Sequence, residues 1–150
     1  MAISTQINSP VEYRKLTFVL TSSNIKSMYG TPVLVLPAMG LHTIIVIHDA
    51  FFEFVYTAPD YTDGEFGSFV LQYGNTIHGG SSNIAALPPA VLTNSQSVVG
   101  ASAQINLNLT GPISNLVNTG IYASNSVAAY ATGNGLMNMT LFYSIINTIA

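Results

Sequence analysis

The stretch that decides the fold is LMNMTLFYSIIN, residues 136–147. Along it, every second side chain is apolar: Met137, Met139, Leu141, Tyr143 and Ile145. Because successive side chains of a β-strand point to opposite faces, this period of two predicts a strand with one face in a core. The segment QINLNLT, residues 104–110, has the same alternation in its strict form. Both segments predict a sheet with one buried face and one wet face.

Other segments rich in Val, Ile, Thr, Tyr and Phe lie on both sides of these two, separated by short runs of Gly, Pro and Asn. Such punctuation is typical of a chain that turns often between strands. We expect further strands over residues 16–21, 32–37, 41–57, 66–73, 96–110 and 121–132. The long one is expected to bend near His48 and Asp49. The Asp-Gly pair in the loop 59–64 predicts a hairpin-type turn, so that 66–73 returns beside 41–57.

Two short helical turns are expected between the strands. Residues 22–29 have Ser or Asn to cap a helix start, and Gly30 to end it. A second turn is expected to begin at Pro88-Pro89, because proline is accepted in the first turn of a helix. Residues 1–15 are polar with Pro10 among them, which indicates an extended arm. The sequence therefore predicts one all-β domain over residues 16–150, a β-sandwich of jelly-roll or similar topology, preceded by that arm.

Charge is the most unusual property of the composition. Only 6% of the 150 residues are charged, against about 25% in ordinary soluble domains. All of them lie between Glu12 and Glu65, so residues 66–150 contain no Asp, Glu, Lys or Arg. Three basic residues and a net charge of −3 argue against nucleic-acid binding and against recruitment to anionic membranes. No stretch approaches the roughly 20 apolar residues of a spanning helix, and we expect no membrane segment and no signal peptide.

The uncharged half favours a protein that is part of an assembly. A free-standing domain normally stays soluble through interspersed charges. Here eleven of the thirteen Asn residues lie after Glu65, and Ser and Thr accompany them. Such side chains can hydrogen-bond across a contact without the cost of desolvating an ion. The alternative is a stable free-standing β-protein that is simply rich in Asn and Thr.

No metal site is expected. Asp60, Asp63 and Glu65 lie close in sequence, but their spacing does not match a calcium-binding EF-hand loop, and an exposed turn explains them. His42 and His48 would lie about 20 Å apart along one strand, too far to share an ion. A histidine packed in a core or interface is the simpler interpretation.

No catalytic residue and no cofactor is expected either. The chain has no Gly-x-Ser-x-Gly motif, no cysteine, and beyond Glu65 only His78 that titrates near neutral pH. We therefore expect that the protein is not an enzyme, and a hydrolase is a minor alternative. The aromatic residues Tyr56, Tyr61, Phe66 and Tyr73 could form a glycan-binding platform, but packing at the base of a loop explains them better.

The order of these segments resembles a loose family of small virion proteins of tailed bacteriophages. The features that carry it are TPVLVLPA at residues 31–38, the apolar strand 43–55, Tyr61-Thr62 in the following loop, LQYG at 71–74, and LFY at 141–143. The resemblance covers about residues 16–146. The turn MGLH at residues 39–42 departs from the Gly-Ala-Gly-Lys type of turn common in such proteins.

The resemblance implies a β-sandwich on the capsid surface, made in the cytoplasm of a bacterial host. It implies a cement or decoration protein that clamps the major capsid protein as a homotrimer, or as a dimer, and needs no cofactor. The alternative is a tail or fibre component that binds a host surface glycan. We expect inter-subunit contacts in the arm and first strand, in the loop near residue 61, and on the polar face of segment 104–110: Val11, Tyr13, Arg14, Tyr61, Asn106 and Asn108.

Overall fold

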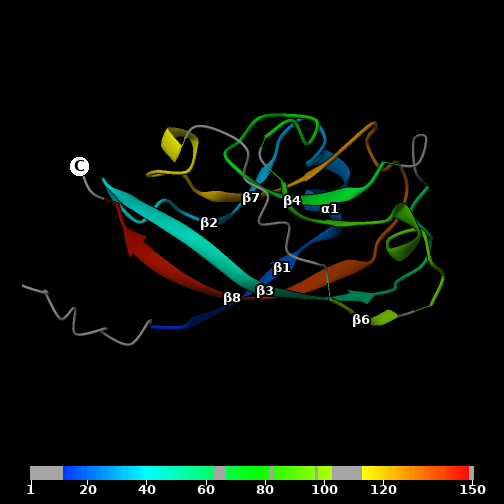
Figure 1. Cartoon of the computed structure of the whole chain (residues 1–150). Helices are drawn as coiled ribbons and strands as arrows, with labels where there is room; N and C mark the ends of the chain where they lie inside the picture. Colours follow the sequence, from blue (N-terminus) through cyan, green and yellow to red (C-terminus); the bar gives the residue numbers. More distant parts are fainter. Residues whose placement is uncertain (1–11, 63–66, 82, 97, 103–112, 149–150) are drawn as a thin grey trace, which may run out of the picture.

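Within the described residues, eight β-strands form two antiparallel four-stranded sheets that pack face to face, which confirms the all-β sandwich (Figure 1). The computed structural model describes residues 12–62, 67–81, 83–96, 98–102 and 113–148, with the backbone alone over 98–102. Sheet A has the order β1 (Arg14–Leu20), β8 (Leu136–Asn147), β3 (Thr43–Val55) and β6 (Val98–Ser102). Sheet B has the order β2 (Val33–Leu36), β7 (Ile121–Asn125), β4 (Phe69–Tyr73) and β5 (Asn83–Leu87). The short helices are α1 (Ser22–Ser27), η1 (Pro89–Val91) and η2 (Ile113–Asn115).

The strands pair in a nested order. The first strand pairs with the eighth, the second with the seventh, the third with the sixth and the fourth with the fifth. This is the order of an eight-stranded double-sheet jelly roll. It contradicts the expected hairpin around residues 59–64, because β3 lies in sheet A and β4 in sheet B. The chain crosses from one sheet to the other there, and the two apolar strands face each other through the core.

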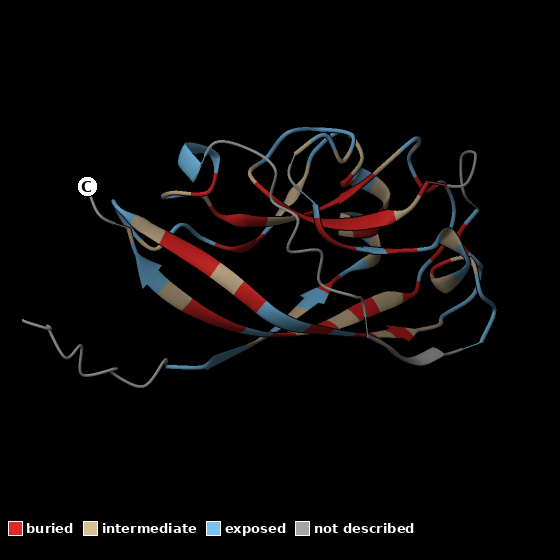
Figure 2. Ribbon diagram, viewed as in Figure 1, coloured by how far each residue is buried: buried red, intermediate tan, exposed pale blue. Residues whose placement is uncertain are grey.

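The longest strand, β3, bends where the sequence predicts. Its register against β8 shifts between Ile47 and Asp49, so His48 is an extra residue in the ladder. Such a bulge bends the strand and re-aims the side chains around it. After the bulge, buried and exposed side chains alternate along β3, as expected for a strand with one wet face (Figure 2).

Helix α1 is capped by Thr21, one residue before Ser22, the first residue that was expected to cap it. The Thr21 hydroxyl accepts from the backbone N of Asn24, while the Asn24 side chain accepts from the backbone N of Thr21. This reciprocal capping box satisfies two of the N–H groups that a helix start leaves free. The second turn, η1, begins at Pro89 as predicted.

Several strands differ from the expectations. Strand β1 begins at Arg14, so the last two residues of the expected arm belong to the sandwich. Strand β7 ends at Asn125, well short of residue 132, and β5 is a strand that the sequence analysis did not identify. The strict alternation of residues 104–110 lies outside the described residues. Strand β8 has the predicted bounds.

The core lies between the two sheets. The rings of Phe52 in sheet A and Phe69 in sheet B meet edge to face, with centroids 5.3 Å apart. Tyr73 of sheet B donates its hydroxyl to the carbonyl oxygen of Ile45 in sheet A, so one hydrogen bond joins the sheets inside the core. Burial raises the pKa of Tyr73 to about 12, because the phenolate would lose its water.

Candidate interaction surface

The central part of the outer side of sheet B is covered by the chain itself. All five residues of β4 are buried, including Val70 and Gln72, which point away from the core. The covering elements are α1 and the loop between β4 and β5, which lie above the β7–β4 part of the sheet in Figure 1. Strand β4 is therefore buried on both faces, whereas the edge strands β2 and β5 keep exposed residues such as Leu34 and Ala86.

Ser124 of β7 holds that cover in place. Its hydroxyl donates to the carbonyl oxygen of Met28 at the end of α1, at 3.1 Å, and accepts from the backbone N of Gly79 in the loop, at 3.2 Å. One side chain, itself fully buried, thus joins the helix and the loop to the sheet. The ring of His78 stacks on the ring of Tyr29, with centroids 4.1 Å apart, and ties the loop to the residues that follow α1.

The outer side of sheet A carries exposed side chains instead. The register of β1, β8 and β3 places them in three rows across the sheet. The rows are Lys15–Phe142–Asp49, Thr17–Thr140–Phe51 and Val19–Asn138–Glu53. We call these nine residues the sheet A face. Phe142, Phe51 and Val19 are 38%, 42% and 45% exposed, and each of the three rows contains one of them.

A polar patch borders the sheet A face at the bulge of β3. The Nε2 of His48 lies 2.8 Å from the Oγ of Ser144 on β8, and the ring of Tyr13 lies against the ring of His48, with centroids 4.8 Å apart. Together the two rings leave Ser144 almost fully buried. The bulge thus anchors the residue that precedes β1 to the centre of the sheet.

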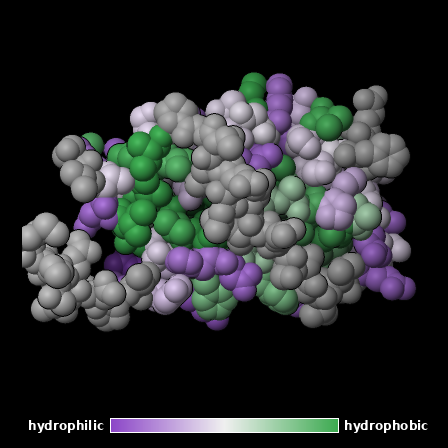
Figure 3. Space-filling model, viewed as in Figure 1, coloured by the Kyte–Doolittle hydropathy of each residue, from purple (hydrophilic) through white to green (hydrophobic). Residues whose placement is uncertain are grey.

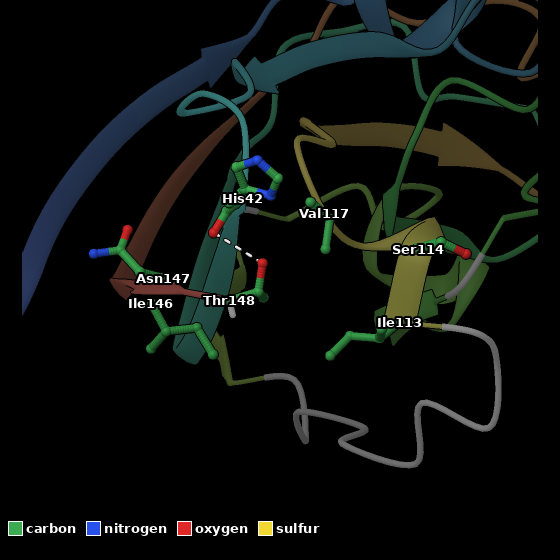
Figure 4. Close-up of a pocket in the computed structure, with 7 residues that line it drawn as sticks. All are labelled: His42, Ile113, Ser114, Val117, Ile146, Asn147 and Thr148. Atoms are coloured by element: carbon green, nitrogen blue, oxygen red, sulfur yellow. Dashed lines mark hydrogen bonds between the residues drawn. The ribbon is translucent and has the colours of Figure 1, made fainter. Parts of the chain in front are cut away.

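A pocket opens at the C-terminal end of β8, where the chain end is marked in Figure 1. It has a volume of about 760 Å³, and its described lining is mostly apolar, from Ile113, Val117 and Ile146 (Figure 4). Thr148 closes one side, because its backbone N and its hydroxyl both donate to the carbonyl oxygen of His42. Figure 3 shows hydrophobic side chains gathered at this end of the molecule. The pocket could accept an apolar side chain, and its described lining residues offer no acid–base pair.

Two of the expected contact residues lie at the start of β1. Tyr13 is 66% exposed although its ring touches His48. Arg14 pairs with Glu12, with 3.1 Å between Nη2 and Oε2, and this hydrogen bond and charge raise the pKa of its guanidinium. Both side chains are accessible to a partner. Val11, Asn106 and Asn108 lie outside the described residues.

Tyr61 was expected at a subunit contact, and the structure corrects this. Its side chain is 2% exposed, its ring packs against Phe54 and Tyr130, and its hydroxyl donates to the carbonyl oxygen of Gly135. Burial raises its pKa to about 12. Because apolar packing and a backbone partner satisfy this residue within the chain, it is not available to a neighbouring subunit.

The aromatic platform considered for glycan binding does not form from Tyr61 and Tyr73, because both are buried. Tyr56 is half-buried and hydrogen-bonds Asp60, which raises its pKa, while Phe66 lies outside the described residues. Packing at the base of the loop is therefore the correct interpretation for the two buried tyrosines. The signal that could have shown this is Gly133, which leaves room for the Tyr61 ring: a Cβ there would lie 2.3 Å from it.

Within the described residues, no group of three His, Cys, Asp or Glu side chains lies close enough to hold a metal ion. The described helices are also too short or too polar to span a bilayer. His42 lies in the turn before β3 and His48 in its bulge, so the two are not neighbours on one face of a regular strand.

Comparison with solved structures finds a similar chain in the cyanophage Pam1 capsid asymmetric unit. The two share 14% sequence identity and superpose with a TM-score of 0.46, over 96% of this chain and 91% of that chain. At this level of likeness the match assigns neither a family nor a function. No protein-family model matches the sequence, and no curated protein matches it.

Proposed function

We propose that this protein is a non-catalytic structural protein of a tailed-bacteriophage virion, located on the capsid surface. In this role it is a cement or decoration protein that bridges subunits of the major capsid protein and stabilises the head. It is synthesised in the host cytoplasm and acts as a homo-oligomer, a trimer or a dimer. The order of sequence segments shared with small virion proteins supports this assignment.

The observation that carries the proposal is the uncharged surface of the second half of the chain. Among the described residues after position 66, the exposed residues include many Asn, Ser and Thr together with five large apolar side chains: Ile77, Ile113, Val127, Phe142 and Ile146. The cores of protein interfaces are depleted in charge in the same way. A chain with this surface loses little by desolvation when neighbours cover it.

The fold is compatible with the same role. Double-sheet jelly rolls occur in viral capsid proteins, and also in lectins and cupins. A fold alone does not assign a function, so the strand order supports the capsid role only by analogy with other proteins of the same fold. A mechanical role requires a rigid body with accessible surface, and the sandwich has both: a core closed by two sheets, and one sheet with an exposed outer side.

The experiment is a measurement of copy number and place in purified virions. A cement protein is expected in hundreds of copies per particle, in a fixed ratio to the major capsid protein, with density on the head lattice in a cryo-EM map. A handful of copies with density at the tail tip would overturn the proposal and favour the glycan-binding tail component. No specific observation favours that second role now, since two of the four aromatic residues that suggested it are buried.

A further inference from the structure

The sheet A face has an ordered distribution of charge. Its β1 side carries Lys15, its β3 side carries Asp49 and Glu53, and the β8 residues between them are uncharged. Lys15 forms no ion pair within the described residues. The face therefore has one positive side and one negative side, separated by a central strand.

This distribution is complementary to itself under one rotation. A two-fold axis that lies in the plane of the face, parallel to β8 and directly above it, exchanges the β1 side of one copy with the β3 side of another. Each row then meets its own reverse, so Lys15 faces Asp49 of the second copy and Thr17 faces its Phe51. The β8 residues Phe142, Thr140 and Asn138 each meet their own equivalents. Two-fold contacts of this kind use one patch on both subunits.

The distances are compatible with such a contact. Stacked sheets pack about 10 Å apart, and the extended Lys15 side chain together with the shorter Asp49 side chain spans that gap. Within one copy, by contrast, β8 separates these two residues. The exposed rings of Phe142 and Phe51 would fill the centre, while the charged residues remain at the rim, where burial of an ion costs little.

We propose that the sheet A face binds the same face of a second copy of this chain, about a two-fold axis along β8. The charge complementarity favours a second copy, because in the first row Lys15 of each copy meets Asp49 of the other on both sides of the axis. The second row is uncharged, and in the third row Glu53 faces Val19. The face has nine residues, against roughly 20–30 a side in a standard interface, so we expect a weak dimer with a dissociation constant of roughly micromolar order. This pairing is a property of the isolated protein and does not depend on the capsid role.

The test uses charge reversal in the purified full chain, followed by sedimentation velocity over a concentration series. Lys15→Glu and Asp49→Lys should each weaken the dimer about tenfold or more, because each creates two like-charge contacts across the axis. The double variant, with both substitutions in one chain, should recover affinity to within about threefold of the natural protein. Lys26→Glu on α1 is the matched control, because it makes the same charge change on the covered side of sheet B.

A second experiment uses the absence of cysteine from the chain. Thr140 lies on the proposed axis, so Thr140→Cys places two thiols opposite each other, and a short bifunctional thiol reagent should link the copies in high yield. Ser23→Cys on α1 should give only the low yield of random collisions. The proposal is overturned by a natural protein that stays monomeric at several hundred micromolar. It is equally overturned if Lys15→Glu leaves the affinity of the oligomer unchanged, or if the double variant binds no more tightly than the single variants. Equal cross-linking yields from the two cysteine variants would overturn it as well. A fold check by circular dichroism separates any of these results from unfolding.

Discussion

The outer sides of the two sheets differ although both belong to one sandwich. On sheet B, α1 and the β4–β5 loop bury Val70 of the central strand β4, while on sheet A the outward-facing Val19 of the edge strand β1 is 45% exposed. A substitution under the cover of sheet B must therefore disturb packing within the chain. A substitution on the outer side of sheet A should leave the fold intact and affect contacts with other molecules. Equal changes on the two sides can test this difference.

The largest expected effect comes from an acidic side chain on each side. Val70→Asp places a carboxylate under the loop without a partner, and we expect it to lower the free energy of unfolding by on the order of 4 kcal/mol or to prevent folding. Val19→Asp places the same group in water and should cost about 1 kcal/mol or less. Urea unfolding of both variants measures the difference. Equal losses would show that the outer side of sheet A is covered as well.

The next effect concerns the hydrogen bonds that hold the cover of sheet B. Ser124→Ala leaves the carbonyl oxygen of Met28 and the backbone N of Gly79 without their partner, and should cost about 1–3 kcal/mol. Thr17→Ala on the sheet A face is the control, with an expected loss of about 1 kcal/mol or less. Hydrogen exchange at Gly79 should become faster in Ser124→Ala. If that rate is unchanged, Ser124 does not anchor the loop.

A smaller effect is expected from the loop that covers Val70. Gly79 has a φ of +64°, and a Cβ added there would lie 3.0 Å from the Cγ2 of Val70. Gly79→Ala should therefore cost about 1–2 kcal/mol, from backbone strain and crowding together. Gly30→Ala provides the comparison, because a Cβ there meets nothing within 4 Å, and it should change the stability by about 0.5 kcal/mol or less. If both variants lose a similar amount of stability, the loop does not pack tightly against Val70.

The last prediction concerns Tyr73, whose hydroxyl joins the two sheets. It has the smallest effect on stability at neutral pH, because the change appears only at alkaline pH. The pKa of Tyr73 rises from 10.0 to about 12 on folding, because the side chain is buried. The unfolded chain loses this proton first, so the stabilisation is complete below pH 10 and is lost as the pH rises toward 12. We expect the urea midpoint to fall over that range in the natural protein, and to fall less in Tyr73→Phe. Burial also raises the pKa of Tyr61 to about 12, so Tyr61 contributes to the fall in the same direction.

Local features of the fold could be predicted from the sequence, and long-range ones could not. The bounds of β8 and the bend of β3 follow from the period of two and from its interruption at His48, which depend only on neighbouring residues. The partner of each strand does not follow from local pattern: Asp63-Gly64 favours a hairpin, but β3 and β4 lie in different sheets. Strand β5 was missed because the short run NIAAL precedes Pro88, whose presence favoured a helical turn.

The candidate surface was only partly predictable for the same reason. The composition indicates that much of the second half of the chain faces neighbours, but it does not show which side of which sheet is free. That depends on where α1 and the β4–β5 loop pack, and this packing rests on Ser124, a residue with no special sequence signal. Tyr61 illustrates the opposite error, since an aromatic residue in a loop can lie on the surface or complete the core. Only its neighbours Phe54 and Tyr130 decide between the two.

The nested pairing of strands also sets an order in which the molecule can assemble itself. Strands β4 and β5 are joined by one loop, whereas Arg14 of β1 must find Tyr143 of β8 from the other end of the chain. Pairing the inner strands first shortens the loop that each outer pair must close. The entropy cost of loop closure is therefore lowest when pairing proceeds from the centre of the sequence outward. Strand β1 then joins last, at the edge of sheet A, and its seven-residue pairing with β8 completes that sheet.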